Sequence, residues 1–198
     1  MDLLDLDRRV DLDRRAVELT TRVVSGASAG QLDLPTPCAG WTLGNLLRHM
    51  VAHNHGWAAA AQGLPARRQT WEEAELGADP AAAYQESAKL VTEAFAAPGL
   101  AGRKLEVYGY GAFPAQVALG MHFVDYLVHG WDVARSLGAP DPTEVDPELA
   151  EEALRIALRW PYQRPDKAFG VKVDVPADAP VGQRLVAYLG RSPAWPQA

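Results

Sequence analysis

The sequence predicts a mainly α-helical protein, with three or four long helices packed as a bundle and a minor β-strand pair near one end. Apolar residues recur at the helical period of 3.6 through most of the chain. Proline and glycine separate these periodic segments. The 198 residues are 48% apolar and 22% charged, which is typical of a globular protein with a core of its own. We expect a single domain over 1–198, with the bundle over about 3–138 and a C-terminal extension over about 139–198.

The predicted helices begin and end at recognisable signals. Thr42 is an N-cap with Asn45 three residues on, a weak form of the capping box. Asp79 followed by Pro80 is an N-cap with proline at the first helical position, and Gly138 stands where a helix C-terminus needs it. The expected elements, in chain order, are helices over about 3–26, 43–62 and 80–97, a strand over 104–108, helices over 114–137 and 147–160, an alternating segment over 168–175, and a short helix over 180–189.

The strand pair is predicted from two short segments that alternate between apolar and polar residues. The first covers 104–108 and is followed by Gly109 and Gly111. The second covers 168–175, and we expect it to pair with the first. No repeat, low-complexity tract or long linker interrupts the pattern.

Charge and composition exclude several classes of partner. The formal net charge of −6 leaves no broad basic surface for a phosphate backbone, so nucleic acid is not expected as a partner. No apolar run approaches the length of a transmembrane helix, and the first residues lack the layout of a secretory signal. The single cysteine, Cys38, has no internal disulfide partner, which favours a reducing cytoplasm. We expect a small-molecule substrate, with a homodimer through an apolar helix face left open.

Two predicted helices carry polar side chains on faces that should be buried. His49 and His53 lie one turn apart on the apolar stripe of one helix. Asp125 and His129 lie one turn apart on the buried face of the helix over 114–137. A buried carboxylate costs several kcal/mol unless it is paired or binds a cation.

A divalent metal held by His49, Asp125 and His129 would satisfy all three side chains. Helical bundles build metal sites in their cores from such inward-facing pairs. Two histidines and one carboxylate, with one position left open, are also the ligand set of catalytic zinc or iron sites. Two alternatives remain open: core histidines satisfied by ordinary hydrogen bonds, and an Asp–His ion pair without a metal.

The segments TPCAGWTLGNLLRHM and DYLVHGWDVARSLG, followed by LGRSPAW, resemble a family of metal-binding helical proteins in the DinB-like superfamily. This family is related to the N-terminal domain of mycothiol-dependent maleylpyruvate isomerase, and the resemblance spans about residues 5–195. It implies a four-helix bundle that binds zinc or nickel through three residues. One is a histidine of the second helix, and the others are an acidic or histidine residue and a histidine four positions later on the last bundle helix. Those positions fall on His49, Asp125 and His129. The isomerase has glutamate where this chain has Asp125.

Four further residues near the predicted site have open roles. His53 and His122 lie on or near the ligand faces, and each is a candidate for a fourth ligand, a proton shuttle or a packing residue. Asp132, one turn beyond His129, is a candidate to orient that imidazole, with a cap or an ion pair as the alternative. Cys38 is expected to be a buried loop residue rather than a ligand.

The predicted site supports three hypotheses of function. The first is an enzyme in which a bound metal activates a low-molecular-weight thiol, such as mycothiol or bacillithiol, for transfer to or isomerisation of a small electrophile. A hydrolase using metal-bound hydroxide is a variant of it. The second is a non-catalytic metal- or ligand-binding bundle, which a closed four-ligand shell using His53 or His122 would favour. The third is a bundle with buried Asp–His pairs and no metal.

Overall fold

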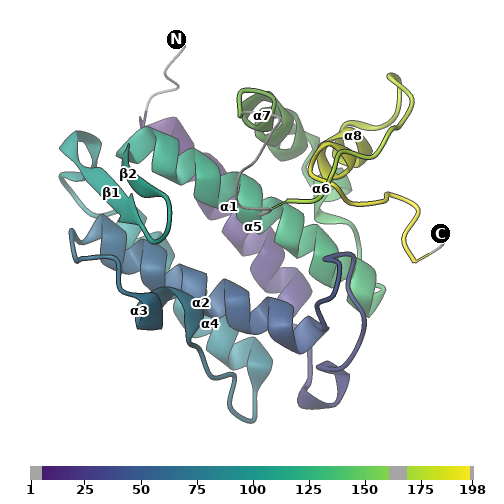
Figure 1. The fold of residues 1–198 in the computed structure, drawn as a ribbon, viewed down its shortest axis with the longest axis horizontal. Helices are drawn as coiled ribbons and strands as arrows, with labels where there is room; N and C mark the ends of the chain where they lie inside the picture. Colours follow the sequence, from purple (N-terminus) through teal and green to yellow (C-terminus); the bar gives the residue numbers. More distant parts are fainter. Residues whose placement is uncertain (1–5, 161–168, 197–198) are drawn as a thin grey trace.

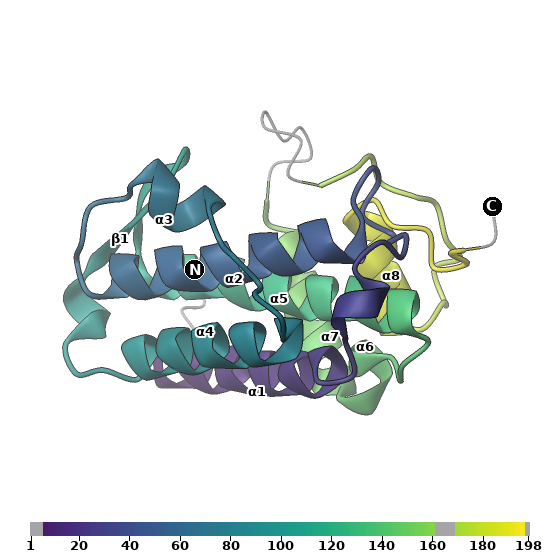
Figure 2. The ribbon, with the colours of Figure 1, turned by 90° about the horizontal axis from the view of Figure 1, so that it is seen from below.

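Four long helices form the bundle in the structure, a computed structural model that describes residues 6–160 and 169–196 (Figure 1). They are α1 (Leu6–Val24), α2 (Leu43–Ala61), α4 (Pro80–Phe95) and α5 (Ala115–Leu137). Helix α1 packs along α5 and α4, and α2 packs along α4 and α5. Figure 2 shows two layers, with α2 and α5 lying over α4 and α1. The predicted fold class, a mainly helical DinB-like bundle with a small strand pair and a short C-terminal helix, is confirmed.

Shorter elements cover the ends and one side of the bundle. They are α3 (Arg68–Glu72), β1 (Lys104–Val107), β2 (Gly111–Pro114), α6 (Pro142–Val145), α7 (Pro147–Ala157), α8 (Val181–Tyr188), and 3₁₀ turns at Ala29–Gln31 and Leu100–Gly102. Helices α7 and α8 pack on each other, and α7 packs on α5 on the side away from α2 (Figure 1). The sequence did not predict α3, α6 or β2.

The predicted caps fix the ends of the bundle helices. The Asn45 amide donates to the Thr42 hydroxyl at 3.3 Å, and the Thr42 amide donates to the Asn45 side chain at 3.1 Å, which completes a capping box. The Ala82 amide donates to Asp79 at 3.0 Å. Gly138 ends α5 with φ of 65°, a left-handed conformation that glycine adopts without strain.

The predicted pairing of 104–108 with 168–175 is wrong. Strand β1 instead pairs with β2 as an antiparallel hairpin, with Lys104 opposite Pro114. Two glycines with positive φ, Gly109 and Gly111, turn the chain back on itself at once, so the nearest segment takes the pairing. Residues 169–175 form no strand, and Val171 is 84% exposed; Ala168 lies outside the described residues.

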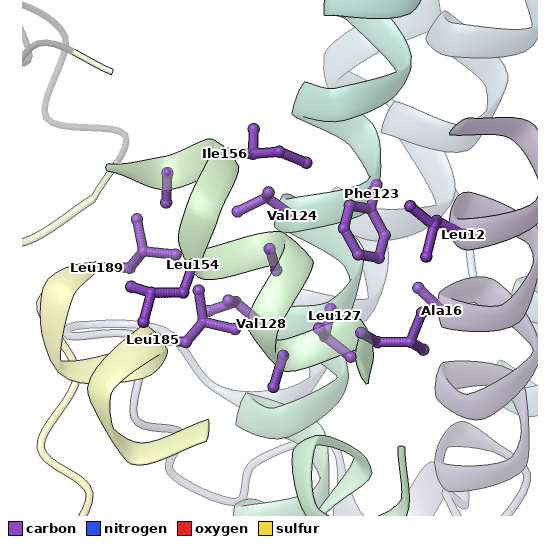
Figure 3. Close-up of a cluster of buried hydrophobic side chains, with 14 of the residues drawn as sticks. Leu12, Ala16, Phe123, Val124, Leu127, Val128, Leu154, Ile156, Leu185 and Leu189 are labelled. Carbon is purple, nitrogen blue, oxygen red and sulfur yellow. The ribbon is translucent and has the colours of Figure 1, made fainter. Parts of the chain in front are cut away.

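Three clusters of buried apolar side chains fill the interior. One lies where α7 and α8 close against α1 and α5, and Figure 3 shows Phe123, Leu127 and Leu154 within it. A second lies under the hairpin, around Trp57 and Leu119. The third joins α1, α2, α4 and α5. Between these clusters, facing turns of α2 and α5 carry the polar side chains described below. No helix of residues 6–160 or 169–196 has the length and apolar character needed to cross a membrane.

Candidate metal centre

Two pairs of side chains, one from α2 and one from α5, meet between these helices. The imidazoles of His49 and His53 lie in contact, with ring centroids 3.8 Å apart. One ligand atom each from His49, His53 and Asp125 can be chosen so that all three lie within 4.8 Å of one another. His129 adjoins them, with its Nε2 3.4 Å from Asp125 Oδ1 and its ring centroid 5.2 Å from that of His49. The structure thus places His129 beside His49 and Asp125, but the group whose ligand atoms lie within 4.8 Å of one another contains His53 and not His129.

The electrostatic state of the two α2 histidines suits metal binding. Burial lowers the pKa of His53 to about 4, an effect that Asp125 only partly opposes. Burial, together with repulsion from His53 and His129, lowers the pKa of His49 well below its ordinary value. Both rings are therefore neutral at pH 7, which is the form that coordinates metals.

His129 is oriented by a chain of buried polar contacts on its far side. Its Nδ1 donates to Asp132 Oδ2 at 3.0 Å, and Asp132 also forms an ion pair, so both roles considered for this residue are compatible with the structure. Arg191 holds the same carboxylate, with Nη2 3.0 Å from Oδ2 and Nε 3.4 Å from Oδ1. With Nδ1 protonated, His129 Nε2 presents a lone pair to Asp125. The two atoms lie 3.4 Å apart, close enough for a single metal ion to contact both.

The Asp132–Arg191 pair is charged although both side chains are buried. Burial by itself would raise the pKa of Asp132, but Arg191 and the hydrogen bond from His129 bring that pKa below its ordinary value. Burial likewise works to lower the pKa of Arg191, and Asp132 raises it above its ordinary value. Sequence reasoning missed Arg191 because 59 residues separate it from Asp132. Its place in the LGRSPAW motif was the available signal.

Aromatic rings border the cluster on two sides. Trp41 packs edge-on against His49, with centroids 4.8 Å apart, and lies nearly parallel to the His129 ring at 6.5 Å. Trp71 of α3 packs edge-on against His53 at 5.4 Å. Trp71 approaches α2 closely because Gly56 has no side chain, since a Cβ there would lie 2.2 Å from the indole. These rings limit the access of water to the imidazoles.

Cys38 lies near the site but outside the donor cluster. Its Sγ accepts from Arg191 Nη2 at 3.7 Å, and the residue is half-buried. Burial raises the pKa of the Cys38 thiol to about 11, so in the metal-free protein the thiol stays protonated at neutral pH. The sequence predicted a buried loop residue, and the structure places Cys38 in a loop where it is only partly buried.

The structure does not bring His122 into the cluster. Its Nδ1 lies 2.6 Å from Asp13 Oδ1, and its Nε2 lies 3.4 Å from Asn54 Oδ1. Asn54 in turn donates to Ser87 Oγ at 2.9 Å, which links all four bundle helices through buried polar groups. Because both of its ring nitrogens face these partners, His122 is placed as a core residue rather than as a ligand.

Comparisons with known proteins agree with this architecture. The family model described as the mycothiol maleylpyruvate isomerase N-terminal domain matches residues 14–134. Two uncharacterized proteins of Mycobacterium tuberculosis, from strains H37Rv and CDC 1551, are each 35% identical over 185 residues, which cover 90% of this chain and 95% of the relative.

Two solved structures share the fold. The crystal structure of the mycothiol-dependent maleylpyruvate isomerase matches with a TM-score of 0.60 at 20% identity, over 78% of this chain and 68% of that one. A histidine-to-alanine mutant of that isomerase matches with the same TM-score and coverage at 19% identity.

Proposed function

We propose that this chain, which belongs to the mycothiol maleylpyruvate isomerase N-terminal domain family, binds a divalent metal and uses a mycothiol-type thiol. The thiol is either transferred to a small electrophile or assists the isomerisation of that electrophile. The observation that carries the proposal is the cluster of His49, His53 and Asp125, whose ligand atoms lie within 4.8 Å of one another beside His129. Neutral imidazoles and a carboxylate are the donors that zinc and nickel take in proteins.

In this proposal His49, Asp125 and His129 hold the metal, which is zinc or nickel. A bound divalent cation lowers the pKa of a thiol beside it, so that the thiol reacts as thiolate at neutral pH. Asp132 and Arg191 hold His129 with its Nε2 toward Asp125, which fixes the donor atom before any metal arrives. Trp41 packs against His49 and Trp71 against His53, so that two sides of the imidazole pair are covered by aromatic rings.

Metal analysis tests the first half of the proposal. Protein purified without an affinity tag should contain a stoichiometric divalent metal, and His49→Ala and His129→Ala should lose it. His55→Ala is the matched control, because His55 lies on the same helix but outside the cluster. A parent protein without metal, even after incubation with zinc or nickel, would exclude the proposed chemistry.

A thiol assay tests the second half. Mycothiol with maleylpyruvate, the compound in the relative's name, is the first combination to measure, followed by a panel of small electrophiles. Activity should disappear after chelation and return when zinc or nickel is added back. Activity that survives complete metal removal would refute the mechanism, and a metal-loaded protein inert toward the whole panel would favour a binding role.

A further inference from the structure

We propose that His53 is itself a metal ligand, so that this chain closes the metal's coordination shell with His49, His53, Asp125 and His129. The inference rests on the proposed function in one respect, that a divalent metal binds here. It goes further because a three-residue site leaves one position for water or thiol, whereas four protein donors fill a tetrahedral shell.

Geometry favours His53 as a donor rather than a packing residue. His53 belongs to the group whose ligand atoms lie within 4.8 Å of one another, together with His49 and Asp125. Its ring lies 3.8 Å from that of His49 and is tilted by 44°, so the two imidazoles converge on the same space instead of stacking flat. The two residues are one helical turn apart, the spacing with which bundle helices supply pairs of ligands.

The polar atoms of these side chains also lack other partners. Within residues 6–160 and 169–196, the imidazoles of His49 and His53 make no side-chain hydrogen bond, whereas both ring nitrogens of His122 face polar groups. Asp125 has a single short polar contact there, with His129. The three residues are partly rather than fully buried, which leaves their ligand atoms open to an ion from solution. A cation among His49, His53 and Asp125 would satisfy them together.

The surroundings hold the His53 ring in place. Trp71 packs against it edge-on at 5.4 Å, and Gly56 lets the indole lie directly on α2. A ring confined in this way loses little freedom when it binds a metal. The consequence for function is specific: thiol chemistry at the metal then requires that the thiol displace a donor or add as a fifth ligand. If neither occurs, the closed shell favours a metal-binding role without catalysis.

Cobalt is the probe, because the visible absorption of Co²⁺ is intense in a four-coordinate site and weak in a six-coordinate one. Metal-free parent protein should give the intense spectrum. In His53→Gln we expect the spectrum to weaken and Co²⁺ to bind at least about tenfold more weakly, since even loss of a ligand's hydrogen-bonding partner costs that much. His55→Gln, the control, should match the parent, and His49→Gln should lose affinity as a positive control.

The outcomes separate this inference from the proposed function. If His53→Gln keeps the parent's spectrum and affinity while His49→Gln loses them, the metal site stands and His53 is not a ligand. If the parent binds no Co²⁺, Zn²⁺ or Ni²⁺, the proposed function fails, and this inference fails with it. A crystal structure of the zinc-loaded parent provides a test that needs no variant. A His53 nitrogen about 2.0–2.1 Å from zinc supports the inference, and one beyond about 3 Å overturns it.

Discussion

Replacement of Asp132 by Asn should destabilise the protein strongly, because it leaves a buried guanidinium without its counter-ion. Arg191 is 3% exposed and Asp132 is fully buried, with two nitrogens of the arginine on the carboxylate. Removing one partner of a buried ion pair costs about 3–5 kcal/mol. For a chain of this size that corresponds to a fall in melting temperature of roughly 6–20 °C. Arg191→Met should cost a similar amount, since it removes the counter-ion of the buried carboxylate and leaves it the hydrogen bond from His129.

A double-mutant cycle on the metal-free protein measures the coupling between these two side chains. Urea unfolding of the parent, Asp132→Asn, Arg191→Met and the double variant gives the four free energies of unfolding that are needed. We expect the double variant to be more stable than the sum of the single effects predicts, by about 2 kcal/mol or more, because it contains neither unpaired charge. Arg184→Met, at an exposed position of α8, is the control and should stay within about 0.5 kcal/mol of the parent.

Two results would refute this reasoning. Single variants that each cost less than about 1 kcal/mol would show that Asp132 and Arg191 are not a desolvated pair. Strictly additive effects would show that the two side chains do not interact. The same variants also report on the metal site: Asp132→Asn should weaken zinc binding about 10–100-fold, because Asp132 fixes the tautomer of His129.

The remaining predictions concern the pH response and the close contacts of the helices. The pKa of His53 falls from 6.5 in the unfolded chain to about 4, so the unfolded state of the metal-free protein takes up the proton first as the pH drops. The free energy of unfolding of the metal-free protein should therefore be highest above pH 6.5 and fall by on the order of 3 kcal/mol toward pH 4. In urea titrations, His53→Gln should show a weaker dependence of this free energy on pH. Gly130→Ala should lower the free energy of unfolding by about 1–3 kcal/mol in the same assay, because the new Cβ would lie 2.4 Å from Thr20 Oγ1 where α1 and α5 touch. An unchanged free energy of unfolding would contradict that contact. Gly56→Ala should displace Trp71 and change the tryptophan fluorescence, and an unaltered emission spectrum would show that the indole does not lie on α2.

Local signals were sufficient for most of the helices. Thr42 with Asn45, and Asp79 with Pro80, mark helix starts through contacts that involve only neighbouring residues, and the structure contains those contacts. The partner of a strand is not a local property. The sequence predicted β1 correctly but gave it 168–175 as its partner. Alternation of apolar and polar residues shows that a segment has a buried and an exposed face, but not which other strand it pairs with.

The candidate metal ligands also show a division between what local periodicity predicts and what tertiary packing decides. Helical periodicity alone placed His49 and His53 on one stripe and Asp125 and His129 on another, because one turn of helix fixes the relation between residues four apart. Only the packing of α2 on α5 decided that His53 faces Asp125, while His122 faces Asp13 on α1. The approach of two helices depends on all the side chains between them, which no single segment encodes.

From its sequence by itself, the chain determines a helical bundle, the stripes that carry imidazoles and carboxylates, and membership in a family of such bundles. The tertiary structure decided which of those groups share one space, and it brought Arg191 across 59 residues to Asp132. The physical reason is the separation of the interacting residues along the chain. Hydrogen bonds and side-chain periodicity within a helix are set by residues a few positions apart. The ion pairs and donor clusters between helices exist only after apolar burial has packed those helices together.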